Sequence, residues 1–260
     1  MDLKLNNKYA LVCGSTAGIG KATAITLASE GVQVTLIARN RDKLKTVLAD
    51  LPQQRTHDFI VADFSNPTEL KSKVSEYVTN NHGFHIIVNN TGGPKGGPVF
   101  SAEVNEFENA FTQHLKCNHV LAQTVVPFMK EEGYGRIINV ISTSVKQPLD
   151  GLGVSNTIRG AVANWSKTLA NELGQFGVTV NNVLPGATGT ERLAEIIKNK
   201  SAKTGISIDD ASNTMKNAVP AKRFAKPEEI ANAITFLASE AASYINGVNL
   251  PVDGGRTKSL

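Results

Sequence analysis

The sequence predicts an α/β protein built on a doubly wound parallel sheet, with helices covering both faces of the sheet. Short apolar segments rich in β-branched residues alternate with helical stretches along the 260 residues. Strands that are apolar on both faces are typical of a parallel sheet that lies between two helical layers. Glycine-rich or polar residues follow several of these strands, and open parallel sheets bind their ligands at that edge. We therefore expect a single domain of about seven strands with a ligand site at one edge of the sheet.

A glycine-rich turn joins the first strand to the first helix. Residues 9–12 form a short apolar strand, residues 13–20 read C-G-S-T-A-G-I-G, and helical spacing continues from Lys21. Glycine lets the backbone turn tightly and lets a pyrophosphate approach, and the free N–H groups at the start of the helix attract its charge. The G-x-x-x-G-x-G spacing therefore indicates a dinucleotide site, with a glycine turn that binds no ligand as the alternative.

The second strand, residues 32–38, ends directly before Arg39. In a dinucleotide-binding fold the end of this strand meets the adenosine ribose, where an acidic residue pairs with the 2′-hydroxyl of NAD. An arginine at that place holds the 2′-phosphate of NADP instead. Ala38 and Arg39 therefore favour NADP(H) over NAD(H), and the alternative is that Arg39 only caps a surface turn.

The later elements continue the same alternation. A helix over residues 41–51 follows Arg39, and Asp63 stands at the carboxyl end of the third strand. Polar or glycine-rich residues also follow the next three strands, at residues 89–93, at Ser142 and at residues 185–186. The predicted strands after the second are residues 59–62, 85–88, 135–142, 178–184 and 248–252.

The segment between Gly186 and Pro227 lies outside this alternation. Residues 191–200 have the spacing of a short helix, and a polar stretch follows them through Asn213. An insertion of this kind above the ligand edge can serve as a substrate lid. We expect a small lid lobe over about residues 190–226, with plain mobile surface as the alternative.

Composition and charge exclude several classes of protein. Hydrophobic residues make up 41% of the chain and charged residues 19%, and 27 basic against 23 acidic residues give a net charge of +4. The basic residues are spread along the chain, whereas a nucleic-acid binder concentrates them on one face or in a tail. No apolar run is long enough to span a membrane, and the first residues lack the pattern of a signal peptide. The cysteines Cys13 and Cys117 suggest neither a disulfide framework nor a metal site, so we expect a cytoplasmic protein without nucleic-acid, membrane or metal partners.

Several pieces in a fixed order resemble the short-chain dehydrogenase/reductase superfamily over nearly the whole chain. Residues 220–247 also look like the same region of bacterial 3-oxoacyl-acyl-carrier-protein reductases. The resemblance implies a single Rossmann-type domain, a nicotinamide cofactor and a homo-oligomer, expected to be a tetramer whose contact involves helices at about residues 103–132 and 151–176. The matching pieces are residues 13–20, Asp63, 89–92 (N-N-T-G), the strand ending at Ser142, 180–190 (V-N-N-V-L-P-G-A-T-G-T) and 252–255 (V-D-G-G).

The same resemblance implies a set of cofactor contacts. Residues of the glycine turn should line the pyrophosphate and the ribose, Asp63 should hydrogen-bond the adenine, and residues after the fourth strand should lie along the cofactor. Residues after the sixth strand should lie near the nicotinamide carboxamide. The implied cofactor-binding residues are Gly14, Ser15, Ile19, Gly20, Arg39, Asp63, Asn90, Gly92, Pro185, Gly186, Thr188 and Thr190.

The catalytic positions depart from the family pattern. The family uses a tyrosine as general acid, a lysine four residues later, a serine that holds the substrate carbonyl, and an asparagine on an earlier helix. In this sequence Ser142 fills the serine place, and His114 stands at the asparagine place. Ser155 and Arg159 replace the tyrosine and the lysine, which gives an S-N-x-x-R pattern in place of Y-x-x-x-K. Some relatives in this superfamily look similar and are usually called reductase-like.

This replacement changes the available chemistry. A serine hydroxyl ionises several pKa units above a phenol, and an arginine does not release a proton near neutral pH. Ser155 and Arg159 therefore cannot repeat the tyrosine–lysine proton transfer. Ser142 and Arg159 can stabilise a forming alkoxide, and the proton is expected to come from His114 or from solvent. The ordinary pKa of histidine makes His114 a candidate acid if it points into the site, and the alternative is a structural histidine.

Two functions follow from these expectations. The leading one is an NADP(H)-dependent oxidoreductase that acts on a small carbonyl or alcohol substrate with altered proton-transfer residues. The alternative is a cofactor-binding protein with little or no turnover, acting as a sensor or a partner subunit. Reductases of acyl-carrier-protein substrates tend to present arginines near the ends of the helices before the fifth and sixth strands. This chain has Gly133 and Phe176 around there, which argues against a carrier-protein substrate.

Overall fold

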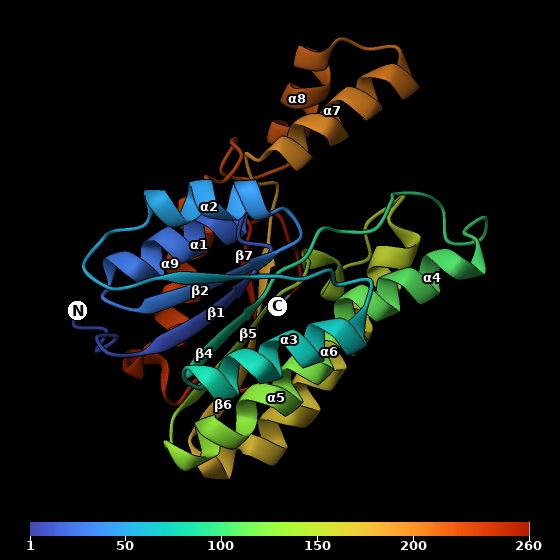
Figure 1. Cartoon of the computed structure of the whole chain (residues 1–260). Coiled ribbons are helices and arrows are strands. Elements are labelled where there is room, and N and C mark those ends of the chain that lie inside the picture. Colours follow the sequence, from blue (N-terminus) through green and yellow to red (C-terminus); the bar gives the residue numbers. More distant parts are fainter. Residues whose placement is uncertain (260) are drawn as a thin grey trace.

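The computed structural model describes residues 1–259, which contain one parallel sheet of seven strands (Figure 1). The strand order is β3-β2-β1-β4-β5-β6-β7, so β1 and β4 are neighbours at the point where the strand order reverses. The predicted doubly wound α/β architecture is confirmed, and the ends of the predicted strands are displaced by at most two residues. The strands are β1 (Tyr9–Cys13), β2 (Gln33–Ala38), β3 (Asp58–Val61), β4 (Ile86–Asn89), β5 (Gly135–Val140), β6 (Val178–Pro185) and β7 (Asn249–Val252).

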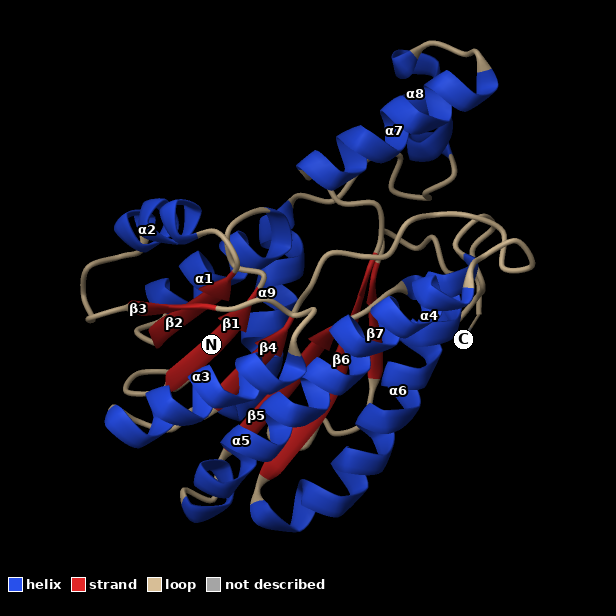
Figure 2. Ribbon diagram, turned by 45° about the vertical axis from the view of Figure 1, so that its right-hand side comes forward, coloured by secondary structure: helices blue, strands red, loops and turns tan. Residues whose placement is uncertain are grey.

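Helices cover both faces of the sheet (Figure 2). One face carries α1 (Gly18–Ser29), α2 (Arg41–Asp50) and α9 (Pro227–Ala238). The other face carries α3 (Pro67–Asn80), α5 (Cys117–Glu131) and α6 (Gly153–Leu173). The remaining helices are α4 (Val104–Phe111), α7 (Glu191–Thr204) and α8 (Ile208–Asn217). Among the described helices, none combines the length and the apolar character of a membrane span.

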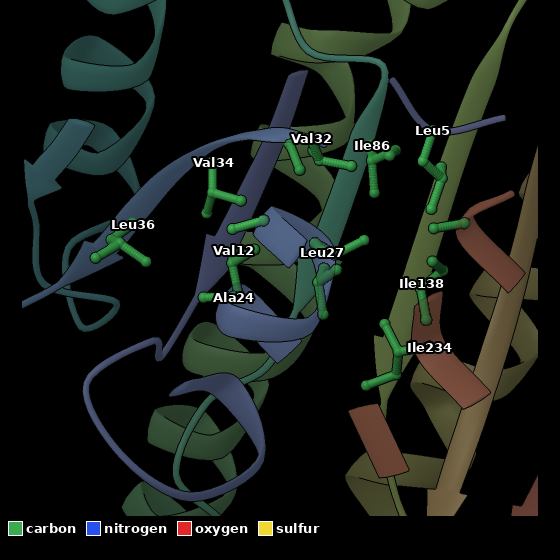
Figure 3. Packing of buried hydrophobic residues seen from close by; sticks show 14 of the residues in the cluster. Leu5, Val12, Ala24, Leu27, Val32, Val34, Leu36, Ile86, Ile138 and Ile234 are labelled. Carbon is green, nitrogen blue, oxygen red and sulfur yellow. The ribbon is translucent and has the colours of Figure 1, made fainter. Parts of the chain in front are cut away.

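The strands divide the core into two apolar layers. In β1, Ala10 and Val12 face the layer under α1 and α9, whereas Leu11 and Cys13 face the layer under α3 and α5. This alternation follows from the two-residue period of a strand, and it explains why both sets of residues are apolar. Figure 3 shows the first layer, where Leu27 of α1 is fully buried beside the strand side chains. Burying one such leucine stabilises the fold by about 2 kcal/mol.

The lobe after β6 differs from the sequence prediction. The polar stretch expected through Asn213 is instead helix α8, and Ser207 caps this helix through a 3.0 Å hydrogen bond from a backbone N–H of its first turn. Ala211 of α8 packs with Leu193 and Ile197 of α7 in a small apolar cluster. The two helices therefore bury their few apolar residues against each other. Because most residues of the segment are polar, the sequence does not indicate this packing. Figures 1 and 2 show this pair standing away from the sheet, beyond the carboxyl ends of the strands.

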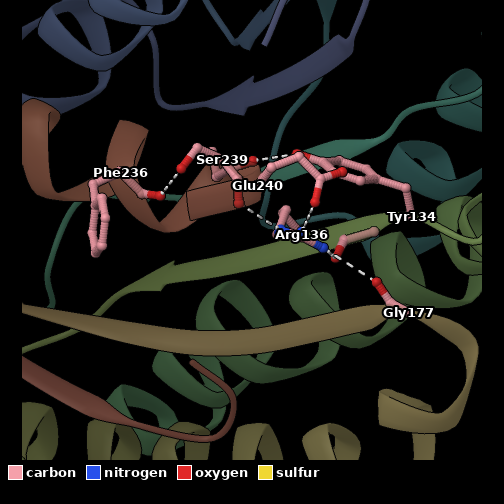
Figure 4. A network of polar contacts seen from close by, with 8 residues as sticks. Tyr134, Arg136, Gly177, Phe236, Ser239 and Glu240 are labelled. Atoms are coloured by element: carbon pink, nitrogen blue, oxygen red, sulfur yellow. Dashed lines mark hydrogen bonds and ion pairs between the residues drawn. The ribbon is translucent and has the colours of Figure 1, made fainter. Parts of the chain in front are cut away.

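A buried arginine holds the opposite, amino-terminal edge of the sheet (Figure 4). Arg136 of β5 is 2% exposed, and its Nε donates to the Ser239 carbonyl oxygen at 3.2 Å. Its Nη1 donates to the carbonyl oxygens of Gly135 and Gly177 at 2.8 and 3.2 Å. The guanidinium also lies 4.1 Å from the centre of the Tyr134 ring. These contacts tie β5 to the turn after α9 and to the turn before β6, away from the ligand edge.

Candidate active site

Two glycines of the turn after β1 have no room for a side chain. Gly14 has a φ of +59°, and a Cβ at this position would lie 2.3 Å from the carbonyl oxygen of Asn90. A Cβ at Gly20, in the first turn of α1, would lie 2.2 Å from the carbonyl oxygen of Gly14. The glycine spacing is therefore required by close backbone approach at both positions.

The amino terminus of α1 fits an anion. Its N-cap residue, Ala17, provides no side-chain hydrogen bond, and the first turn contains no acidic residue. The first N–H groups of a helix have no partner within the helix, and an anion satisfies them. In the same turn the hydroxyl of Ser15 is fully buried without a hydrogen-bond partner among the described residues. The glycine turn and α1 therefore fit the pyrophosphate of a dinucleotide cofactor.

Asn90 links the ends of β1 and β4, where the strand order reverses. Its Nδ2 lies 3.3 Å from the carbonyl oxygen of Cys13 and 3.4 Å from that of Gly14, and it donates to both. Open α/β sheets bind ligands in the crevice at this point. Gly92 lies exposed in the loop that follows, while Ile19 in α1 packs against the core below the turn. Asn90 therefore fixes the glycine turn in addition to its expected place beside the cofactor.

The residues expected at the adenosine end lie at the ends of β2 and β3. Arg39 is exposed, and no described residue forms a hydrogen bond or an ion pair with it. The cap of α2 is Asn40, whose side chain accepts from the N–H of Lys43 at 2.9 Å. Arg39 is therefore not needed as a helix cap. Asp63 accepts from the N–H of Ser65 at 2.9 Å, which fixes its carboxylate at the end of β3.

The residues expected near the nicotinamide form the base of the two-helix lobe. Pro185 ends β6, and a Cβ at the next residue, Gly186, would lie 2.7 Å from Cα of Asp253. The hydroxyl of Thr188 donates to the Gly186 carbonyl oxygen at 3.0 Å. Thr190 donates to the Thr188 carbonyl oxygen at 3.3 Å and caps α7. These residues therefore connect the end of the sheet directly to the lobe.

Three of the expected catalytic residues come from β5 and α6. Ser142 follows β5, and its Oγ accepts from the N–H of Ser144 at 3.1 Å, which orients the hydroxyl. Arg159 of α6 is 7% exposed, and its Nη1 donates to the Val140 carbonyl oxygen at the end of β5 at 3.1 Å. Ser155 lies four residues before Arg159 on the same face of the helix. It is half-buried, and no described residue forms a hydrogen bond with it.

His114 lies in a π-helical turn, Thr112–Lys116, between α4 and α5. A π turn contains an additional residue, so it shifts the directions of the side chains, and such turns often occur at functional sites. The His114 ring is 1% exposed, and its Nδ1 lies 2.6 Å from Oγ1 of Thr91 in the loop after β4. Its Nε2 is buried and has no hydrogen-bond partner among the described residues. His114 therefore points into the interior and carries one unsatisfied ring nitrogen.

Burial changes the charge state of the site. It lowers the pKa of His114 to about 2, and the positive charge of Arg159 adds to this effect. The imidazole is therefore neutral near physiological pH, which corrects the expectation that His114 has an ordinary pKa. Burial also lowers the pKa of Arg159 to about 10, and the guanidinium remains charged at neutral pH. The site thus combines a permanent cation with a neutral imidazole.

Thr91 is a residue of the site that the sequence reasoning missed. It belongs to the N-N-T-G piece, where only the asparagine and the glycine drew attention. A hydroxyl in a loop at the ligand edge was the available signal. Its partner, His114, lies on another element, within the π turn. Thr91 could therefore be noticed in the sequence, but its hydrogen bond to His114 could not be predicted from it.

The fold and this site define a Rossmann-type protein of the dinucleotide-binding class. Residues 14–257 match the family described as enoyl-(acyl carrier protein) reductase. The chain belongs to the short-chain dehydrogenase/reductase family of oxidoreductases, as the sequence predicts.

Similar proteins extend over the full length of the chain. The 3-oxoacyl-[acyl-carrier-protein] reductase FabG of Staphylococcus epidermidis is 32% identical over 253 residues, which cover 96% of this chain and 98% of FabG. The NADPH-dependent reductase BacG of Bacillus subtilis is 27% identical over 259 residues, which cover 98% of this chain and 100% of BacG. The structure of L-sorbose reductase from Gluconobacter frateurii, complexed with NADPH and L-sorbose, has a TM-score of 0.93 and 31% identity and covers 100% of both chains.

Proposed function

We propose that this protein is an NADP(H)-dependent oxidoreductase that interconverts a carbonyl and an alcohol with Arg159 in place of the family lysine. The observation that supports this most is the buried guanidinium of Arg159, held at the end of β5 beside Ser142 and close enough to His114 to lower its pKa. NADPH appears in the names of BacG and of the L-sorbose reductase structure, which supports the same cofactor here.

The residues of the site divide the work of such a reaction. A bound nicotinamide cofactor supplies or accepts the hydride. The glycine turn and the amino terminus of α1 would bind the pyrophosphate. Ser142 and Arg159 donate hydrogen bonds to the substrate oxygen, where negative charge develops during reduction. Ser155 lacks the acidity for proton transfer, so its part is to leave space beside Arg159 for the substrate.

The proton at the substrate oxygen is assigned to His114 in its neutral form, or to water. Thr91 can donate its hydroxyl hydrogen to Nδ1, which leaves a proton on Nε2, the ring nitrogen without a partner. A neutral imidazole can act in this way, as in triosephosphate isomerase, where a histidine of lowered pKa polarises a carbonyl. Thr91 is then a positioning residue, because it selects the tautomer of His114.

We expect no limb of the pH profile between about pH 5 and 9 to belong to His114, because its pKa lies below this range. The measurement is kcat/KM for reduction across this range in the wild type and in His114→Asn, which restores the family residue. A limb of the pH profile within this range that is present in the wild type and absent in His114→Asn would contradict the neutral role.

Thr91→Val should lower kcat by about 10-fold through loss of one hydrogen bond to His114, whereas Thr91→Ser should retain most of the rate.

The alternative is a cofactor-binding protein without turnover, which the replacement of the family tyrosine and lysine by Ser155 and Arg159 favours. The experiment that separates the two is a screen of NADPH oxidation against short ketones, quinones, 2-oxo acids and acyl-thioesters. Turnover that Arg159→Ala abolishes supports the enzyme. NADPH binding without turnover across the whole panel supports the alternative.

We expect NADP to bind more tightly than NAD, because Arg39 is free to meet the 2′-phosphate with a permanent charge. Arg39→Ala should weaken NADP binding by about 10- to 100-fold, the effect of one hydrogen bond to a charged group, and should leave NAD binding unchanged. Titration calorimetry with both cofactors measures this. The matched control is Arg41→Ala, because Arg41 lies over the Phe59 ring at 5.6 Å. Equal or tighter binding of NAD would rule out the assignment.

We also propose a homo-oligomer, expected to be a tetramer, with contacts through α4, α5 and α6. An open groove of about 660 Å³ lies on this side of the molecule, lined in part by Phe107, Phe111 and Ile158. Phe111 is 39% exposed beside this groove, and together with Phe107 and Ile158 it gives the groove apolar surface that a second copy of the chain would cover. Light scattering at micromolar concentration should give about four times the 27.7 kDa chain mass, and Phe111→Lys should lower it. A wild-type monomer would contradict this proposal.

The two-helix lobe over about residues 190–226 is proposed as the substrate lid. Arg192 of α7 donates to the Pro94 carbonyl oxygen in the loop after β4 at 3.4 Å, so the lobe contacts the site side of the molecule. Ile196 and Ile208 are 41% and 56% exposed on the lobe, and a bound substrate would cover apolar surface of this kind.

The proposed compartment is the cytoplasm, and the structure has Cys13 and Cys117 as buried free thiols, as a reducing compartment allows.

A further inference from the structure

Arg159 is a buried cation without an anionic partner. Its side chain is 7% exposed, and its one hydrogen bond within residues 1–259 joins Nη1 to the Val140 carbonyl oxygen. No described carboxylate lies within ion-pair distance of it, and burial alone accounts for its lowered pKa. An arginine carries five N–H donors, so Nε and Nη2 are left without a protein acceptor. Neither atom is among the fully enclosed polar atoms without a partner in the described residues, so a ligand can reach both.

The other buried arginine shows how the chain satisfies such a group when no ligand is needed. Arg136 donates to the carbonyl oxygens of Ser239, Gly135 and Gly177 and lies over the Tyr134 ring (Figure 4). A carboxylate oxygen of Glu240 also lies 3.9 Å from its Nη2. Arg159 has none of these additional contacts. The difference therefore points to a missing acceptor at the ligand edge and not to a general property of buried arginines in this fold.

The neighbours of Arg159 lack acceptors too. The His114 Nε2 is buried and has no partner in the part of the chain that the structure describes, and Arg159 is the only charged group that acts on the imidazole. Ser142 Oγ accepts from the N–H of Ser144, and its hydroxyl hydrogen is left to donate. We call Arg159, His114 and Ser142 the Arg159 cluster. It offers donors and a positive charge, which suit a negatively charged oxygen.

We propose that the substrate carries a carboxylate directly beside its reacting carbonyl, as a 2-oxo acid does, and that Arg159 binds this carboxylate. The inference rests on the proposed oxidoreductase function. A guanidinium forms two parallel hydrogen bonds with a planar pair of oxygens, and Nε and Nη2 form such a pair of donors. Because Arg159 bonds to the end of β5 two residues before Ser142, a carboxylate on Arg159 and a carbonyl on Ser142 fit a substrate in which the two groups are adjacent.

Reduction of a 2-oxo acid adds one hydride and one proton to the substrate. C2 gains the hydride that the reduced nicotinamide cofactor loses, and the carbonyl oxygen gains one proton, which gives a 2-hydroxy acid. The carboxylate forms and breaks no covalent bond. Its contribution is binding through the Nε and Nη2 pair, so the C2 oxygen accepts from the Ser142 hydroxyl and from an N–H of Arg159 outside that pair.

The test compares pairs of substrates that differ in the carboxylate, with NADPH as the reductant. Pyruvate, 4-methyl-2-oxopentanoate and phenylpyruvate are each measured against the methyl ketone with the same side chain. We expect kcat/KM to be at least about 30-fold higher for the 2-oxo acid of the preferred pair, which corresponds to about 2 kcal/mol, since hydrogen bonds to a charged group are strong. Equal or faster reduction of the neutral ketones would overturn the proposal and leave the oxidoreductase function standing.

A second measurement requires no turnover. Oxamate, which cannot be reduced, should raise the melting temperature of the protein saturated with NADPH, and Arg159→Gln should weaken its binding at least 10-fold. Arg159→Lys, which keeps the charge, should bind oxamate with intermediate affinity. Arg55→Gln is the control, because Arg55 is a half-buried arginine whose side chain donates to Asn7. Unchanged oxamate binding in Arg159→Gln would overturn the proposal, whereas its loss in a protein without turnover would support the anion site and contradict the proposed function.

Discussion

Arg159→Ala is expected to lower turnover by about 100-fold or more while cofactor binding stays largely intact. The guanidinium is held at the end of β5 by the Val140 carbonyl oxygen. In the proposed reaction its charge stabilises the oxygen that becomes negative during reduction. Such a donor acts more strongly in the transition state than in the ground state, so its loss appears in kcat. Steady-state kinetics on the substrate found in the screen, with NADPH titrated separately, measure both quantities.

Two further variants separate charge from structure. Arg159→Lys keeps a positive charge and should retain more activity than Arg159→Ala, and thermal unfolding of each variant checks that the fold is intact. The double variant Ser155→Tyr with Arg159→Lys should not produce a good reductase, because a large ring must enter space shaped for a serine. Full activity of a folded Arg159→Ala protein would refute the role of the charge.

Gly20→Ala is expected to weaken cofactor binding by at least about 100-fold and to lower the free energy of unfolding by about 1–3 kcal/mol. The added Cβ would lie 2.2 Å from the carbonyl oxygen of Gly14, which is backbone and cannot rotate away. The glycine turn must therefore move, and its N–H groups move with it away from the pyrophosphate position. Cofactor titration and chemical unfolding measure the two effects.

The control for this variant is Gly160→Ala. Gly160 also lies in a helix, α6, but a Cβ there would meet nothing within 4 Å. Alanine favours a helix over glycine by about 1 kcal/mol, so this variant should be as stable as the wild type or more stable. If Gly20→Ala behaved like Gly160→Ala in both measurements, the tight turn would not be what limits cofactor binding.

The sequence by itself determined the architecture and the edge at which ligands bind. Alternating apolar strands and helices specify a doubly wound parallel sheet, because each strand must be apolar on both faces. The spacing of Gly14 and Gly20 predicted a tight turn after the first strand, and the structure shows the close backbone approach that requires glycine there. Ser142 could be placed at this edge because it follows a strand, which is a short-range pattern. Arg159 was placed only through the resemblance to the family, where it stands in the place of the lysine.

The tertiary structure decided the charge states and the contacts between distant segments. The neutral state of His114 cannot be predicted from the residue pattern, because its pKa depends on burial and on Arg159, which lies on another helix. The contact between Thr91 and His114 lies at a π turn, and no simple residue pattern marks such a turn. The α7–α8 pair was equally hidden, because its small apolar cluster forms only when the two helices meet. Burial, pairing and direction of a side chain depend on neighbours that are remote in the chain, so only the folded structure could determine them.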